Sequence, residues 1–369
     1  MLLSASIIVR DEERHLGACL ESIQPVVDEI VVVDTGSRDE TKQIAEAHGA
    51  RVFELAWRDD FAAARNFALS RSRGDWILYI DADERLCDHN PTALRTILGA
   101  PNLVGCRVRL QARMGYTAFP ELRLFRNDPR IRFEGVIHEN IWPAIARYIE
   151  ASGGEVADSD LELEHVGYDG PQDHKHRRNL PLLRESLKRD PTHAYCWHHL
   201  GTIHEALDEQ AQAREAWRNG IAAVRKSGHL RASDSLLYVS LVQSCMKTGE
   251  EVGELLQEAR RLFPRNAQFI WLEGHAHMNA GRFEDAVAAF EQTLDAQKQN
   301  DMDDNVGYDQ RLFGIYTFNP LATCLFRLQC YGAARHYYEL AEQADPDSPE
   351  YKIKRQLCAN LEKSLTDQG

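Results

Sequence analysis

The hydrophobic pattern of the chain changes period near residue 176, and this change limits the folds that the chain can adopt. Before it, short apolar runs alternate with segments of helical period; the clearest runs are LSASIIV (3–9), EIVVVD (29–34) and DWILYID (75–81). This alternation predicts βαβ units and a mostly parallel sheet with helices on both faces. After residue 176 the strand-like runs disappear, and one helical segment follows another. We therefore expect an α/β domain over residues 1–175 and an all-α domain over residues 176–369.

The second half contains an internal repeat. The segment WHHLGTIHEALDEQAQAREAW (197–217) matches IWLEGHAHMNAGRFEDAVAAF (270–290), which begins 73 residues later. The match pairs Gly201 with Gly274, Ala213 with Ala286 and Trp217 with Phe290. The offset is about twice a 34-residue helical-hairpin period, which leaves room for a divergent unit over 231–262. This pattern resembles tetratricopeptide repeats; an unrelated helical bundle is the alternative. The polar stretch 295–310 is expected to be a long loop.

A cluster of carboxylates ends the most apolar run of the first half. In WILYIDADER, Asp81, Asp83 and Glu84 follow a predicted buried strand. Carboxylates this close repel one another, so they either spread into water or hold a cation. Ligands of parallel sheets bind at the carboxyl ends of the strands, and Asp34 stands at another such end. The alternative is that Asp83 caps the helix expected near Pro91.

Four motifs occur in an order that resembles one enzyme family. IIVRDEERHL, VVVDTGSRDETKQIA, WRDDFAAARNFALSRSRGDWILYIDADE and RLFRNDPRIRFEGVIHENI follow one another over roughly residues 1–170. This order resembles the family-two glycosyltransferases of GT-A fold. With the helical repeats, the chain further resembles the bacterial subgroup that includes sublancin-type peptide glycosyltransferases and lipopolysaccharide-core enzymes.

The resemblance implies a fold and an activity. The fold is an α/β GT-A (Rossmann-like) nucleotide-sugar domain followed by an all-α domain of tetratricopeptide-like repeats. The activity is a metal-dependent, inverting transfer of a sugar from a nucleotide-diphosphate donor, by default a UDP-hexose. The acceptor is a protein, a peptide or a glycan, and the repeats are expected to recruit it or to form a homo-oligomer.

The resemblance also assigns four donor-binding residues, and each has a simpler alternative. Asp34 would bind the nucleotide base, or it caps the helix expected over Asp39 to Ala47. Glu12 would lie against the ribose or base edge, or it is an exposed glutamate of a first helical turn. Arg65 and Asn66 would contact the diphosphate or ribose, or they are exposed to solvent.

The same resemblance assigns the metal site. Asp81 would contact the ribose and a metal-bound water, while Asp83 would ligate Mg²⁺ or Mn²⁺, which prefer hard oxygen ligands. His138 would complete the metal shell or touch the diphosphate. His165, in LEHVGY, is possible as well, but the pattern gives it no firm role.

The general base is expected to be Glu139, which would take a proton from the acceptor nucleophile. Glu121, in PELRLFRN, and Glu84 compete for this role.

Composition excludes several other classes of function. The formal net charge of −14, from 43 basic and 57 acidic residues, argues against general binding to nucleic acid. No window approaches the roughly 20 apolar residues of a transmembrane helix. The eight cysteines are scattered without a C-x-x-C pair, which favours reduced thiols in a cytoplasm.

Two other functions compete with glycosyl transfer. A catalytically degenerate transferase could serve as a repeat-based protein-interaction scaffold. Nucleotidyl transfer on a similar α/β scaffold would need a glycine-rich phosphate loop after the first strand, and VRDEERHL has no glycine.

Overall fold

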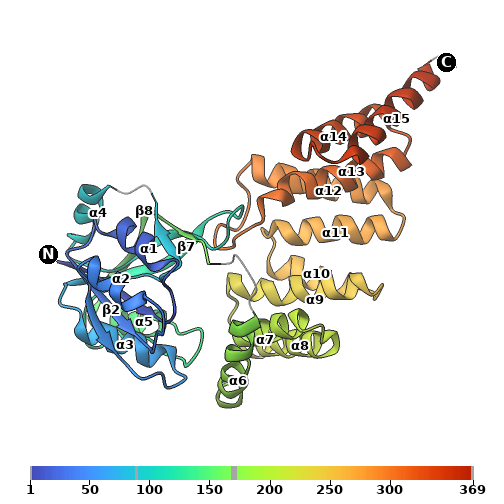
Figure 1. Ribbon diagram of the computed structural model, residues 1–369. Coiled ribbons are helices and arrows are strands. Elements are labelled where there is room, and N and C mark those ends of the chain that lie inside the picture. Colours follow the sequence, from blue (N-terminus) through green and yellow to red (C-terminus); the bar gives the residue numbers. More distant parts are fainter. Residues whose placement is uncertain (1, 88–89, 168–172, 367–369) are drawn as a thin grey trace. The chain divides into compact units, whose positions relative to one another are not determined.

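The computed structural model describes residues 2–87, 90–167 and 173–366 (Figure 1). Contacts between residues divide the chain into two units, Met1–Pro191 and Thr192–Gly369. Helix α6 (Asp173–Arg189) belongs to the first unit. The expected domain boundary at residue 175 falls inside this helix and stays a prediction.

The first unit is built on one eight-stranded mixed sheet with the strand order β3-β2-β1-β4-β7-β6-β8-β5. Its strands are β1 (Leu3–Val9), β2 (Glu29–Asp34), β3 (Arg51–Glu54), β4 (Trp76–Tyr79), β5 (Glu84–Leu86), β6 (Leu103–Gln111), β7 (Phe119–Arg126) and β8 (Glu155–His165). Strands β1 to β4 pair in parallel with one another, as the βαβ pattern predicts. In the rest of the sheet β6 and β8 also pair in parallel, but β7 pairs antiparallel with both β4 and β6, and β5 with β8, so the sheet is mixed. The short β6–β7 connection allows direct antiparallel pairing without a crossover helix.

Helices cover both faces of the sheet, as expected. They are α1 (Leu16–Ile23), α2 (Thr41–Ala47) and α4 (Pro91–Leu98) on one face, and α3 (Phe61–Arg71) and α5 (Trp142–Ser152) on the other. Strand β4 serves both cores, since Trp76 and Leu78 pack on the first face while Ile77 and Tyr79 pack on the second. This alternation is the period of two that a strand buried on both faces must fill with apolar residues. The α/β fold class is confirmed.

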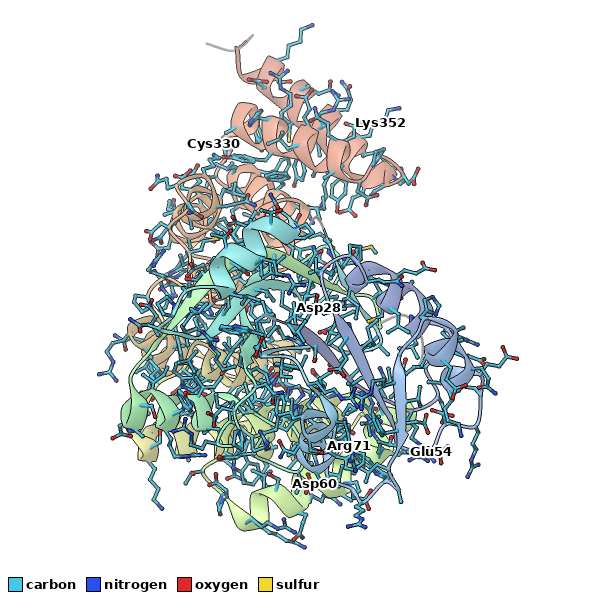
Figure 2. The ribbon with its side chains drawn as sticks, turned by 90° about the vertical axis from the view of Figure 1, so that its left-hand side faces the viewer. Asp28, Glu54, Asp60, Arg71, Cys330 and Lys352 are labelled. Carbon is cyan, nitrogen blue, oxygen red and sulfur yellow. The ribbon has the colours of Figure 1, made fainter. Side chains whose placement is uncertain are left out.

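Strand register brings the polar strand ends to one edge. Val9 pairs with Asp34, and Ser6 pairs with Tyr79, so β1, β2 and β4 all end at the same edge of the sheet. Helix α3 begins beside this edge. Its N-cap is Asp60, labelled in Figure 2, whose carboxylate accepts a hydrogen bond of 2.8 Å from the backbone N–H of Ala63.

The second unit consists of successive antiparallel helix pairs (Figure 1). Its helices are α7 (Ala194–Ala206), α8 (Gln210–Ser227), α9 (Ser235–Lys247), α10 (Gly253–Leu262), α11 (Ala267–Asn279), α12 (Phe283–Lys298), α13 (Ile315–Arg327), α14 (Tyr331–Ala344) and α15 (Pro349–Thr366). The predicted loop over 295–310 is wrong at its start, because α12 continues to Lys298. None of the helices in the described part of the chain is long and apolar enough to cross a membrane.

The repeat seen in the sequence corresponds to two equivalent helix pairs. Helices α11 and α12 begin 73 residues after α7 and α8. In the first pair, a Cβ added to Gly201 would lie 2.2 Å from Nε1 of Trp217; in the second, a Cβ on Gly274 would lie 2.7 Å from Phe290. Both glycines therefore allow a close approach of two helices around an aromatic ring, and the tetratricopeptide-like arrangement is confirmed.

Candidate functional site

A cavity of about 290 Å³ lies in the first unit at the carboxyl ends of β1 and β4. It brings together six of the residues assigned from the sequence: Glu12, Arg65, Asp81, Asp83, His138 and Glu139. His165 and, from α6, Lys175, Arg178 and Asn179 also line it. The residues come from segments far apart in sequence, and the register of the strands explains why they meet.

Arg65 is the central cation of this cavity. Its Nε donates a hydrogen bond of 2.5 Å to Glu139 Oε1, and its Nη2 donates one of 2.8 Å to Asp81 Oδ1. The side chain is 9% exposed, so the alternative that Arg65 simply faces solvent is wrong. Arg65 is buried together with its neighbours on α3, Ala62, Ala64 and Ala68. Its Nη1 is buried and has no hydrogen-bond partner among the described residues, so a bound ligand would satisfy it.

The three carboxylates after β4 separate into two environments. Glu84 is 1% exposed and accepts two hydrogen bonds from Arg123, of 2.6 and 3.1 Å. It also accepts a bond of 2.9 Å from the backbone N–H of Asp81. Burial raises the pKa of Glu84, while the Arg123 guanidinium opposes this change. Glu84 is thus held in the protein interior, which leaves Asp81 and Asp83 to face the cavity.

Arg65 also controls the charge of Asp81. Burial raises the pKa of Asp81, but the Arg65 and Arg123 guanidiniums outweigh it and hold this pKa below its ordinary value. Asp81 is therefore a carboxylate at neutral pH, and its orientation is fixed by the ion pair.

Asp83 lies beside an imidazole and an ammonium group. Its Oδ2 is 3.3 Å from His165 Nε2 and 3.9 Å from Lys175 Nζ. Strand pairing places the imidazole there, because Glu84 lies opposite His165 in the β5–β8 ladder. The alternative that Asp83 caps the next helix is wrong, since Asn90 caps α4 through the backbone N–H groups of the first turn.

The backbone also approaches Asp83 closely. A Cβ added to Gly167 would lie 2.0 Å from Asp83 Oδ2. Only glycine fits here without displacing the carboxylate.

Asp83 Oδ2 and His165 Nε2 are spaced to bind a divalent cation. Binding through Nε2 requires the imidazole proton on Nδ1, which here accepts a hydrogen bond of 3.3 Å from the backbone N–H of Gly167. Two adjacent ligands of an octahedral ion with bonds of about 2.1 Å stand about 3 Å apart, close to the observed 3.3 Å. The described residues contain no group of three or more histidines, cysteines or acidic residues placed to hold a metal. His138 lines the cavity, with a left-handed φ of 52°, and its role as a ligand stays a prediction.

Asp34 is buried beside the cavity, next to the lining residue Thr35. Its Oδ1 accepts hydrogen bonds of 2.9 Å from the backbone N–H groups of Gly36 and Ser37. It does not cap α2, which begins after Glu40, so that alternative is wrong. Its Oδ2 is buried without a hydrogen-bond partner among the described residues, and thus suits an N–H donor of a ligand.

Glu12 lies before helix α1 and is half-buried, so the alternative of an exposed helical glutamate is wrong. Burial, and then repulsion from Asp83, raise the pKa of Glu12 to about 7. This side chain is therefore poised to accept or donate a hydrogen bond to a ligand at neutral pH.

Asn66 and Glu121 occupy other positions. The amide of Asn66 donates to the carbonyl of Phe133 at 2.9 Å and accepts from its backbone N–H at 2.8 Å. Asn66 therefore fixes the backbone of the segment that precedes VIHEN. Its contact with the nucleotide-sugar donor stays a prediction. Glu121 is on β7, where burial raises its pKa.

Sequence reasoning missed the part of the cavity formed by α6. Lys175 and Arg178 follow the motifs and lie in a segment with an ordinary helical pattern. Their signal was the pair of cations one helical turn apart, which also occurs on many solvated helix faces.

Comparisons with known proteins agree with the resemblance. Residues 4–111 match the family model described as "Glycosyl transferase family 2". The chain is 38% identical over 209 residues to the TPR repeat-containing protein Synpcc7942_0270 of Synechococcus elongatus, covering 54% of this chain and 52% of that protein. It is 25% identical over 233 residues to the SPbeta prophage-derived glycosyltransferase SunS of Bacillus subtilis, covering 61% and 54%. It is 36% identical over 156 residues to the lipopolysaccharide core biosynthesis glycosyltransferase LpsC of Rhizobium meliloti, covering 38% and 57%.

The chain thus spans about half the length of these curated relatives. The family match covers the strands and helices that form most of the cavity. The resemblance to family-two glycosyltransferases joined to tetratricopeptide-like repeats is confirmed.

Proposed function

We propose that this chain is a metal-dependent, inverting glycosyltransferase. It moves a sugar from a nucleotide-diphosphate donor, a UDP-hexose by default, to a protein, peptide or glycan acceptor. The observation that carries the proposal is the juxtaposition of four charged residues in one cavity: Asp81, Asp83 and Arg65, which lie within the segment that matches the family-two glycosyltransferase model, and Glu139, which follows it.

The nucleotide end of the donor is assigned to the β1–β2 side of the cavity. Asp34 Oδ2, which is buried and unsatisfied among the described residues, would accept a hydrogen bond from an N–H of the base. Glu12 would bond the ribose, and Arg65 Nη1 would donate to a donor oxygen. These contacts orient the sugar carbon toward the acceptor.

A divalent cation, Mg²⁺ or Mn²⁺, would be held by Asp83 and His165, with His138 as a further candidate ligand. When bound, it offsets the negative charge that develops on the departing nucleoside diphosphate. Asp81, whose pKa stays low beside Arg65, would hold the ribose and a metal-bound water. The cavity supplies the carboxylates that this chemistry needs in a fixed orientation.

Glu139 is proposed as the general base. The acceptor nucleophile attacks the anomeric carbon as the bond to the diphosphate oxygen breaks, and Glu139 takes the proton of the nucleophile. Arg65 holds Glu139 Oε1, which leaves Oε2 to face the acceptor. Glu84 is less suited, because both of its oxygens bond Arg123.

The acceptor is assigned to the helical unit. A cavity of about 710 Å³ there is lined by Trp271, Tyr316 and Tyr351, together with Arg311 and Asn319. Aromatic rings beside an amide and a guanidinium suit a peptide or sugar chain, and this larger cavity lacks the paired carboxylates of the donor site. Association of the repeats into a homo-oligomer is part of the same proposal. So is a cytoplasmic location, which the scattered cysteines without a C-x-x-C pair favour.

The test is a thermal-shift screen of nucleotide sugars with and without Mn²⁺. A ligand that binds the native state raises its apparent stability, so at least one nucleotide sugar should raise the Tm, and more so with metal. Asp83→Asn should remove the metal-dependent part, whereas Asp160→Asn, at an exposed position on β8, should keep it. The absence of a shift with every nucleotide sugar would contradict the proposal.

A further inference from the structure

Helix α6 brings two cations to the candidate donor cavity. Lys175 and Arg178 lie one helical turn apart and both line it, although they lie well beyond residues 4–111. Lining residues also include the cations Arg10 and Arg65 and the carboxylates Glu12, Asp81, Asp83 and Glu139. The cations that no carboxylate already neutralises are the ones available to an anionic ligand.

The charge of Arg65 is already balanced, since it bonds both Asp81 and Glu139, and only its Nη1 has no hydrogen-bond partner among the described residues. Lys175 has a loose partner, with Nζ 3.9 Å from Asp83 Oδ2. Arg178 forms no ion pair among the described residues. Its Nε donates to Asn179 Oδ1 at 3.0 Å, and its guanidinium lies 5.2 Å from the centre of the Phe61 ring.

Arg178 also has a positive neighbour. Burial, and then repulsion from the Arg10 guanidinium, lower the pKa of Arg178, while the Glu12 carboxylate opposes this change. Cations held near one another at a cavity wall repel, and an anion placed between them removes this cost. The geometry of the lining therefore favours an anionic ligand on the α6 side.

The contact between Lys175 and Asp83 explains why an anionic ligand should bind together with a divalent cation. Lys175 sits against the same oxygen, Asp83 Oδ2, that faces His165. A divalent ion bound to this oxygen would carry the same sign of charge as the ammonium group beside it, and the two would repel each other. The ammonium must then find another negative partner in the cavity.

We propose that Lys175 and Arg178 bind the diphosphate of the donor, and that Lys175 moves from Asp83 to the diphosphate when the divalent ion binds. This inference rests on the proposed function and deepens it. It makes α6 a part of the donor site: Lys175 holds the charge of Asp83 balanced before the donor arrives, and both cations then stabilise the leaving diphosphate.

The test measures the binding of three probes by isothermal titration calorimetry in the presence of Mg²⁺. The probes are UDP, inorganic pyrophosphate and uridine, which separate the phosphate contribution from that of the base. Lys175→Gln and Arg178→Gln should each weaken the binding of UDP and pyrophosphate about 10- to 100-fold, the usual loss for a charge-assisted hydrogen bond. Uridine binding should not change.

Arg177→Gln is the matched control, because Arg177 is an exposed neighbour on the same helix. Arg178→Lys keeps the charge and should recover part of the affinity, which a purely structural role of the side chain would not predict. Wild-type affinity for UDP and pyrophosphate in folded Lys175→Gln and Arg178→Gln proteins would overturn this inference while leaving the proposed function in place. A wild-type protein that binds neither UDP nor pyrophosphate in the presence of Mg²⁺ would instead overturn the proposed function.

Discussion

Replacing Gly167 with alanine tests the placement of Asp83 without touching the carboxylate itself. The added Cβ would lie 2.0 Å from Asp83 Oδ2 and 2.6 Å from its Cγ, whereas ordinary contacts begin at 3.4 Å. Asp83 must therefore move by about 1.4 Å, the difference between 3.4 and 2.0 Å. Gly167 has no left-handed φ, so alanine keeps the backbone conformation. Metal ligands tolerate only about 0.5 Å of displacement, and we expect the affinity for Mn²⁺ to fall about 10- to 100-fold.

The assay for Gly167→Ala is a titration of Mn²⁺ in the presence of UDP, followed by the electron paramagnetic resonance signal of free Mn²⁺. Gly17→Ala is the control, because its Cβ would meet atoms no closer than 3.7 Å. Circular dichroism must establish that both variants are folded, because the Cβ added at position 167 also lies 2.7 Å from Asp83 Cβ and part of the shift falls on the backbone. Unchanged Mn²⁺ affinity in folded Gly167→Ala would refute the assignment of Asp83 as a ligand.

Three further predictions concern the helical unit and the chemistry. Gly274→Ala pushes a Cβ to within 2.7 Å of Phe290 and should lower the free energy of unfolding by about 1–3 kcal/mol, measured by urea denaturation; full stability would contradict the close packing. Burial lowers the pKa of His198 and His275 from 6.5 to about 4, so they stay neutral in the folded protein while the unfolded chain takes up protons. The free energy of unfolding should therefore fall as the pH is lowered from 6.5 to 4, by up to about 1.4 kcal/mol per pH unit for each histidine. A urea-denaturation midpoint that stays constant over this range would contradict the prediction. Glu139→Gln should lower kcat about 10²- to 10⁴-fold with little change in the KM for the donor. The same kcat in Glu139→Gln and wild-type protein would exclude Glu139 as the general base.

Local patterns of the sequence were sufficient for the first part of the sheet. Apolar runs alternating with helical segments predicted β1 and β2 with their observed bounds, Leu3–Val9 and Glu29–Asp34, because parallel strands buried on both faces are predominantly apolar. The spacing of Gly201 and Gly274 predicted the equivalent helix pairs, since each glycine faces an aromatic ring at the same offset.

Long-range pairing was not visible in the sequence. The position of His165 beside Asp83 depends on the β5–β8 ladder, which joins segments about 80 residues apart and leaves no local pattern. The burial of Arg65 was also hidden, because an arginine among alanines reads equally well as a solvated position. The antiparallel pairing of β6 with β7, which helps to make the sheet mixed, was not predicted either, because it leaves no local sequence pattern.

The most direct measurement of the central proposal is the release of nucleoside diphosphate from a panel of nucleotide sugars, with and without Mn²⁺, by wild-type protein and Asp83→Asn. We predict that the wild-type protein cleaves at least one nucleotide sugar and that Mn²⁺ raises the rate of cleavage. Asp83→Asn should lose the increase in rate that Mn²⁺ causes, because the cation loses its ligand at the end of β4. Cleavage by Asp83→Asn at the wild-type rate, or no cleavage of any donor by the folded wild-type protein, would contradict the central proposal.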